Sequence, residues 1–292
     1  MKKNIFYMLS LTAIVATSCS NKTTKQEKMV MNEDTTEVIS VDTSKGYSSS
    51  NSVADTIKGV IEKGGIRLTP LTGSTEFPDA SLELNTPKEN AKLKPGPTTF
   101  SYEVKNFVLG NQTNKPCTHC SNSEKGQHIH LILNNAPYIA KYETTFKDTL
   151  KEGHYVALSF LSRSYHESIK QFDAYDLRQF TVGKTKDKDI DLTKPLLFYS
   201  RPKGEYVGDD TKQVLLDFYL VNVDLSPEGN KVKATINGNE FVLDKWQPYI
   251  IEGLPMGENN IKLELLDKDG NKMTGPFNEV ERKITLTEKK SS

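Results

Sequence analysis

The sequence predicts an all-β protein, with two tandem β-sandwiches of the immunoglobulin-like or fibronectin type after a disordered N-terminal tether. Three observations lead to this prediction. From Ser81 onward, apolar and polar residues alternate in short runs separated by turn residues, as in antiparallel strands. No long segment keeps a helical period. The series of runs also occurs twice, and a repeat of roughly 100 residues favours two sandwiches over one eight-stranded barrel.

The first sandwich is expected at 81–183 and the second at 194–287, joined by a linker around 183–193. Strands of the first copy are predicted at 100–108, 127–133, 137–142, 154–161 and 176–182. Strands of the second copy are predicted at 196–199, 214–223, 231–236, 246–251, 261–266 and 281–286. Three segments match between the copies in the same order: 102–107 with 218–223, 128–134 with 231–237, and 150–153 with 254–257.

The N-terminus has the pattern of a bacterial signal peptide, predicted at 1–18. Two lysines precede a short apolar run, and Val15-Ala16-Thr17-Ser18-Cys19 resembles the lipobox of bacterial lipoproteins, in which the cysteine is lipidated. The apolar run is shorter than the roughly 20 residues that span a bilayer. The alternative is an ordinary secretory signal that contains a cysteine. We therefore expect a lipid anchor at Cys19 and a place in the cell envelope on the outer face of a membrane, either periplasmic or surface-exposed.

The segment 19–80 is predicted to be a disordered stalk, because it is rich in Ser, Thr, Lys, Asp and Glu. Over the whole chain, Lys plus Arg and Asp plus Glu both total 38, so the charge balance gives no indication of a nucleic-acid partner. The expected partners are the membrane, through the lipid anchor, and a peptide or envelope protein.

The repeat predicts which way two histidines point. Ile129, Leu131 and their counterparts in the second copy must face the sandwich cores, so His128 and His130 point to the opposite face. The second copy has Lys231 and Lys233 there. We expect an outward-facing histidine pair that could be replaced by lysine without loss of stability.

All five histidines lie in the first sandwich, together with Cys117 and Cys120. Imidazoles at alternate strand positions and a Cys-x-x-Cys pair offer ligands for a borderline metal ion, so copper and zinc are the candidate cofactors. The predicted ligands are His128, His130, Cys117 and Cys120. The alternative is a Cys117–Cys120 disulfide, which is usual for nearby thiols outside the cytoplasm.

A polar segment, 162–170, follows a predicted strand and is expected to be a ligand-binding loop. Its candidate ligand-binding residues are Arg163, Ser164, His166, Glu167 and Lys170. The alternative is a loop held by its own hydrogen bonds. Between the two copies, Arg201 and Lys203 are predicted to form an interdomain clasp or to meet an anion.

Signatures of catalysis are missing: the sequence has no Gly-x-Ser-x-Gly elbow, no phosphate-binding glycine-rich loop and no His-Glu-x-x-His. The sequence therefore predicts a non-enzymatic binding module in the envelope whose ligand cannot be read from the residues. The rival hypothesis is a metal-handling protein.

Several long motifs resemble a family of bacterial secreted and lipid-anchored proteins often catalogued as "phosphopeptide-binding protein" or hypothetical lipoprotein. The segments that carry the resemblance are 127–138, 153–154, 162–170, 200–206 and 275–278, within a similarity that covers about 81–286. The resemblance implies a pair of β-domains outside the cytoplasm, and the family label implies peptide or phosphopeptide binding.

Overall fold

The computed structural model describes residues 59–289, which form strands and two short 3-10 helices. The predicted all-β fold with two sandwiches is confirmed. The predicted signal peptide, the lipidation site Cys19 and most of the predicted stalk lie outside the described residues. Among the described residues, no helix has the length and apolar character that a membrane crossing needs.

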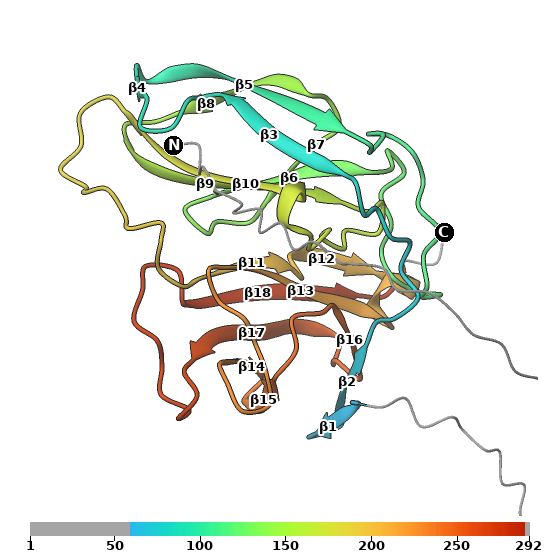
Figure 1. Ribbon diagram of the computed structural model, residues 1–292. Coiled ribbons are helices and arrows are strands. Elements are labelled where there is room, and N and C mark those ends of the chain that lie inside the picture. The colour runs from blue at the N-terminus through green and yellow to red at the C-terminus, as the bar shows by residue number, and fades with distance from the viewer. Residues whose placement is uncertain (1–58, 290–292) are drawn as a thin grey trace, which may run out of the picture. The chain divides into compact units, whose positions relative to one another are not determined.

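Two sheets make up the first sandwich (Figure 1). One has the order β3 (Ser81–Thr86), β5 (Gly96–Lys105), β8 (Thr145–Leu150). The other has the order β4 (Lys92–Leu93), β10 (Tyr175–Val182), β9 (Gly153–Ser162), β6 (His128–Leu133), β7 (Ile139–Lys141). The helix η1 (Phe172–Ala174) precedes β10.

The second sandwich repeats this arrangement. One sheet has the order β1 (Ile61–Lys63), β2 (Ile66–Pro70), β16 (Tyr249–Glu252), β13 (Val214–Val221), β11 (Leu196–Arg201). The other has the order β12 (Gly204–Val207), β18 (Glu279–Thr287), β17 (Gly257–Leu266), β14 (Lys231–Ile236), β15 (Asn239–Leu243). The helix η2 (Gly208–Thr211) follows β12.

The repeat is confirmed strand by strand, because each of β3 to β10 recurs eight strands later with the same neighbours. Even single turn residues recur. Asn106 and Asn222 follow matching strands with φ of 55° and 56°, and Asn134 and Asn237 do so with 50° and 47°. These left-handed conformations suit asparagine, which tolerates a positive φ better than most residues.

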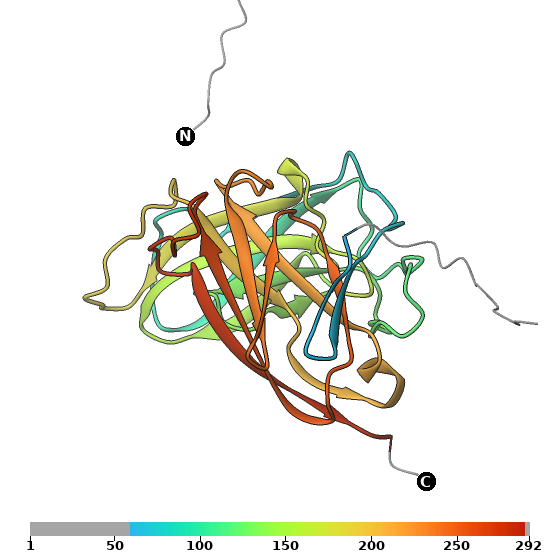
Figure 2. The same cartoon turned by 90° about the horizontal axis from the view of Figure 1, so that it is seen from below.

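The hairpin of β1 and β2 corrects the predicted stalk, because residues 61–70 belong to the second sandwich. Ile66 and Leu68 alternate with exposed or half-buried residues and enter the core of that sandwich. Leu68 pairs with Ile251 of β16. Figure 2 shows the hairpin in blue beside the orange strands of the second copy. The polar composition of the surrounding segment hid this short amphipathic strand.

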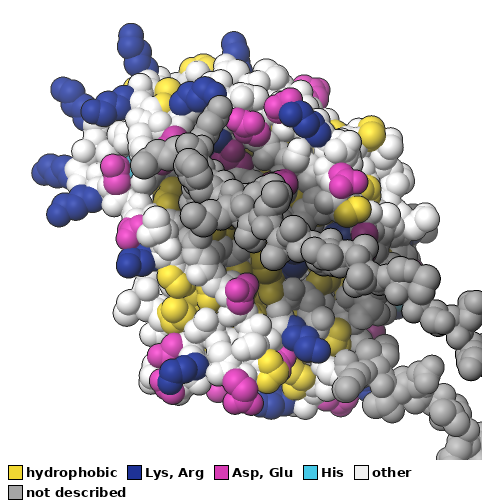
Figure 3. All heavy atoms as spheres, in the orientation of Figure 1, with side chains coloured by type: hydrophobic (Ala, Val, Ile, Leu, Met, Phe, Trp, Pro, Cys, Tyr) yellow, Lys and Arg dark blue, Asp and Glu magenta, His cyan; other side chains and the backbone are white. Residues whose placement is uncertain are grey.

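A third apolar core lies between the two sandwiches and includes Ile132, Phe160, Phe198 and Tyr219. The sheet that contains β6 and β9 is therefore covered on both faces, by the first core on one side and by the second sandwich on the other. On the outer surface in Figure 3, basic and acidic side chains are interspersed, in keeping with equal numbers of each.

Candidate metal centre

Strand β6 presents His128 and His130 on one face and Ile129 and Leu131 on the other. The isoleucine and leucine enter the core of the first sandwich, as predicted from the alternation. Both histidines are fully buried, at 0% exposure. The expectation that they face solvent is wrong, because the second sandwich docks against their face of the sheet.

His166 is the third member of the cluster and comes from the loop after β9. It has φ of 71°, a left-handed conformation at the turn of that loop. His128 Nε2 lies 2.9 Å from His130 Nε2 and 3.1 Å from His166 Nδ1. One nitrogen from each ring can be chosen so that all three atoms lie within 4.8 Å of one another. The third potential ligand beside His128 and His130 is thus His166 of the loop, and not Cys117 or Cys120 as predicted.

The hydrogen bonds of these rings leave one close nitrogen–nitrogen contact without a proton between the two atoms. His128 Nδ1 lies 2.8 Å from the carbonyl oxygen of Gly126, which can only accept, so this nitrogen carries the proton and Nε2 has a free lone pair. The facing nitrogens of His130 and His166 cannot both donate well to that single lone pair. If either ring presents a lone pair instead, two lone pairs face each other at about 3 Å. One cation at the centre would accept the lone pairs of all three nitrogens.

Neighbouring groups also orient the rings. His130 Nδ1 lies 3.3 Å from Ser200 Oγ of β11, so its Nε2 is left to face the cluster. The Tyr138 ring stacks on the His130 ring, and its hydroxyl lies 3.2 Å from His166 Nδ1. The Ser200 contact is to the ring nitrogen of His130 that does not face the cluster, and a contact of this kind fixes the tautomer of a metal-binding histidine.

All three imidazoles are held neutral. Burial lowers the pKa of His128 to about 4, and the positive charges of Arg201 and Lys203 act in the same direction. Burial also lowers the pKa of His130 and of His166 well below the ordinary value of 6.5. The rings therefore keep their lone pairs at neutral pH, which is the protonation state that a metal ion requires.

Cys117 and Cys120 form a disulfide bond and do not belong to the cluster of His128, His130 and His166. The disulfide packs in a separate small cluster with Leu71, Tyr165 and Leu215. The four-residue metal site of Cys117, Cys120, His128 and His130 is therefore not assembled, and the predicted alternative, a disulfide, is present. Spacing alone could not decide between the two.

The loop 162–170 is a buried structural element and does not form an open ligand-binding loop. Arg163 donates to Glu167 Oε1 at 3.1 Å and to the carbonyl oxygen of Thr75. Glu167 accepts from Ser74 Oγ, and Ser164 bonds to Thr113. Lys170 pairs with Asp217 of β13. Because these groups satisfy one another, the structure has the predicted alternative, a loop held by its own hydrogen bonds, and only His166 of the loop candidates joins the histidine cluster.

Arg201 and Lys203 lie between the sandwiches, as the predicted clasp requires. Lys203 Nζ donates to the carbonyl oxygen of Tyr138 at 2.7 Å, and Arg201 Nη1 donates to Tyr206 Oη at 2.9 Å. Neither cation forms an ion pair with any residue between 59 and 289. Burial lowers the pKa of Lys203 to about 8.

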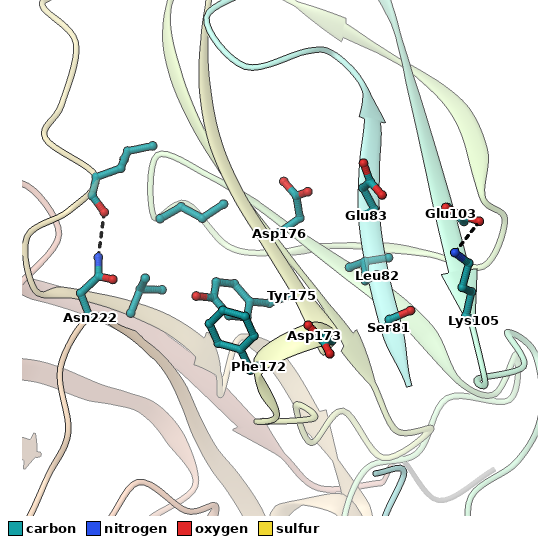
Figure 4. Close-up of a pocket in the computed structure, with 13 residues that line it drawn as sticks. Ser81, Leu82, Glu83, Glu103, Lys105, Phe172, Asp173, Tyr175, Asp176 and Asn222 are labelled. Carbon is teal, nitrogen blue, oxygen red and sulfur yellow. Dashed lines mark hydrogen bonds and ion pairs between the residues drawn. The ribbon is translucent and has the colours of Figure 1, made fainter. Parts of the chain in front are cut away.

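A second concavity, a cleft of about 650 Å³, lies elsewhere on the first sandwich and its junction with the second (Figure 4). Phe172 stands 84% exposed beside it and meets Tyr175 edge to face. Of its carboxylates, Glu103 pairs with Lys105 and Asp176 pairs with Arg178. The cleft has no convergent set of ligand atoms comparable to the histidine cluster.

No protein-family model matches the chain, and no curated protein matches it. Among solved structures, fibronectin(III)-like modules of Clostridium thermocellum CbhA are similar at 13% identity, with 71% of this chain and 94% of that chain covered and a TM-score of 0.26. Two tandem V-type regions of a v-region-containing chitin binding protein are similar at 9% identity, with 71% and 99% covered and a TM-score of 0.21. A Bacteroides ovatus glucan-utilization protein, SGBP-B, is similar at 11% identity, with 70% and 47% covered and a TM-score of 0.22. Likenesses of this size do not indicate a shared ligand.

Proposed function

We propose that this protein is an envelope lipoprotein that binds one transition-metal ion, zinc or copper, through His128, His130 and His166. The observation that carries the proposal is the convergence of three neutral imidazole nitrogens, with two separations of 2.9 and 3.1 Å. Tetrahedral coordination at the usual zinc–nitrogen distance places neighbouring ligand atoms about 3.3 Å apart. A small outward shift of the rings would admit the ion.

The donor set selects the class of ion. Imidazole suits zinc and copper, whereas calcium and magnesium prefer oxygen ligands. No carboxylate belongs to this group of metal-ligating side chains. In this role the protein captures or buffers the ion and catalyses no reaction. Phosphopeptide binding has less support, because the loop cations Arg163 and Lys170 are neutralised by Glu167 and Asp217.

Anchoring at Cys19 is the second part of the proposal. Its support is the sequence pattern of a positive start, a short apolar run and a lipobox-like end. A lipidated Cys19 would hold the metal site on the outer face of a membrane.

Elemental analysis tests the metal site. The purified full chain is stripped with chelator, dialysed against zinc or copper, and washed. We expect about one equivalent of bound ion per chain. His166→Ala should lose most of this binding, because one of three ligands is removed, whereas His119→Ala, a histidine of the same sandwich outside the cluster, should bind as the original does. The proposal is wrong if the original chain retains no ion or if His166→Ala binds equally well.

A further inference from the structure

We infer that Tyr138 supplies the fourth ligand, so that the centre is a three-histidine, one-tyrosine site for an oxidised divalent ion such as Cu(II). The inference rests on the proposed function and names the ion class that the site takes. Its first observation is a distance: Tyr138 Oη lies 3.2 Å from His166 Nδ1. That nitrogen is the one that also faces His128 Nε2 at 3.1 Å. The phenol oxygen therefore lies next to the nitrogen through which His166 joins the cluster.

The phenol ring is held firmly in this position. It is 3% exposed and stacks on His130, while Lys203 Nζ lies 3.8 Å from its centroid, so the ring sits between an imidazole and an ammonium group. The backbone carbonyl of Tyr138 also accepts a hydrogen bond from Lys203. Because the two rings are parallel with centroids 3.6 Å apart, the phenol must tilt out of the stack to bring its oxygen to an ion held by His130.

Tyr142 provides the contrast. Its ring centroid lies 5.0 Å from that of His128, so it is also a neighbour of the cluster. Its hydroxyl, however, bonds to Ser123 Oγ at 2.7 Å, and among the described residues no hydrogen bond joins it to the histidine nitrogens. Of these two tyrosines, only Tyr138 offers its oxygen to the site.

Charge gives an independent reason for an anionic ligand. Three neutral imidazoles leave a divalent ion with its full charge of two. Arg201 is 6% exposed, and its Nε has no hydrogen-bond acceptor among the described residues. Lys203 adds a second nearby cation. A dication beside two cations in a buried place is unfavourable unless an anion joins it.

Tyr138 provides that anion when its oxygen coordinates the ion. The phenol O–H bond breaks, the oxygen–metal bond forms, and the proton leaves to solvent, so the site gains one net positive charge instead of two. A phenolate oxygen is a hard ligand, and the site has no thiolate or thioether, which are the ligands that Cu(I) prefers. The donor set therefore favours Cu(II) over Cu(I).

Copper spectroscopy tests the inference. We expect the stripped full chain, titrated with Cu(II), to develop a phenolate-to-copper charge-transfer band in the visible that saturates at one equivalent. Tyr138→Phe keeps the ring stack on His130, so it should fold and still bind Cu(II) through the histidines, at least tenfold more weakly and without the band. Tyr142→Phe should keep both the band and the affinity.

Each outcome has one meaning. Binding of one Cu(II) without the band, or persistence of the band in Tyr138→Phe, overturns the assignment of Tyr138 and leaves the three-histidine site standing. Failure of the original chain to bind copper or zinc at all overturns the proposed function, and the inference with it.

Discussion

The imidazole of His130 lies face to face with the phenol of Tyr138, with ring centroids 3.6 Å apart and ring planes 7° apart. His130 comes from β6 and Tyr138 from the residue just before β7, so the stack joins two neighbouring strands on the face that meets the second sandwich. The candidate metal ligands are therefore also packing groups. Substitutions at the cluster will act on both metal binding and stability.

The double substitution His128→Lys and His130→Lys should destabilise the fold strongly, although lysines stand at the matching positions of the second copy. Both histidines are fully buried, so the variant would strand two charges away from water. We expect a loss of at least about 3 kcal/mol in the free energy of unfolding. Thermal and urea unfolding with chelator present measure it, with His119→Lys as the control. An unchanged melting temperature would contradict the buried placement.

Stability of the metal-free protein should fall on mild acidification. The pKa of His128 is lowered to about 4 in the folded state, whereas an unfolded histidine titrates near 6.5. Between these values the unfolded state binds more protons, so stability is complete above about pH 6.5 and is lost as the pH falls toward 4. His128 alone contributes about 3 kcal/mol over this window, and His130 and His166 act in the same direction.

Urea unfolding at pH 7 and at pH 4.5, with chelator present, measures this effect. A variant with glutamine at positions 128, 130 and 166 should show a much smaller difference between the two pH values. Equal free energies of unfolding for the original chain at both pH values would refute the prediction.

Asp217→Asn should weaken the junction of the two sandwiches. Asp217 has 0% exposure and accepts from Lys170 and from Ser168, both on the first sandwich. Removing its charge leaves the Lys170 ammonium without its counter-ion, which costs about 3 kcal/mol for a buried pair. Glu258→Gln is the control, because Glu258 and its partner Lys283 are both more than half exposed. We expect its free energy of unfolding to change by no more than about 0.5 kcal/mol. Similar changes in the free energy of unfolding for the two variants would show that the Lys170–Asp217 pair does not stabilise the fold.

Replacement of both Cys117 and Cys120 by serine should leave metal binding intact. The disulfide closes a very short loop, so its loss should lower stability by about 2 kcal/mol. Elemental analysis of the stripped and reloaded variant should still give about one equivalent, because the cysteines do not belong to the histidine cluster. Loss of the ion in the folded variant would restore the cysteines as ligands.

Cys19→Ala should release the protein from the membrane fraction or leave it unprocessed, since the proposed acyl chains require the cysteine thiol and amine. Fractionation and gel migration of the variant and the original check this. Cys117→Ala serves as a control that removes a different cysteine. Membrane association and migration unchanged in Cys19→Ala would refute the lipoprotein proposal.

The sequence predicted what depends on local alternation. Ile129 and Leu131 enter the core as expected, and the repeat placed matching strands of the two copies correctly. It did not predict the burial of His128 and His130, because that depends on the docking of another sandwich against their face. His166 was predicted as a ligand-binding residue of a polar loop but not as a partner of His128, since its approach to His128 follows from the three-dimensional course of the loop.

Hairpin β1–β2 has a consequence for the order in which the chain can fold during synthesis. Leu68 emerges from the ribosome before any residue of the first sandwich, yet its partner Ile251 belongs to β16 of the second. The whole first sandwich must therefore be made, and can fold, while β2 waits with an unpaired edge. Such long-range pairing slows folding and exposes an apolar strand in the meantime. The sheet that contains β1 and β2 can thus close only after β16 has been made, although its first two strands precede the whole first sandwich in the chain.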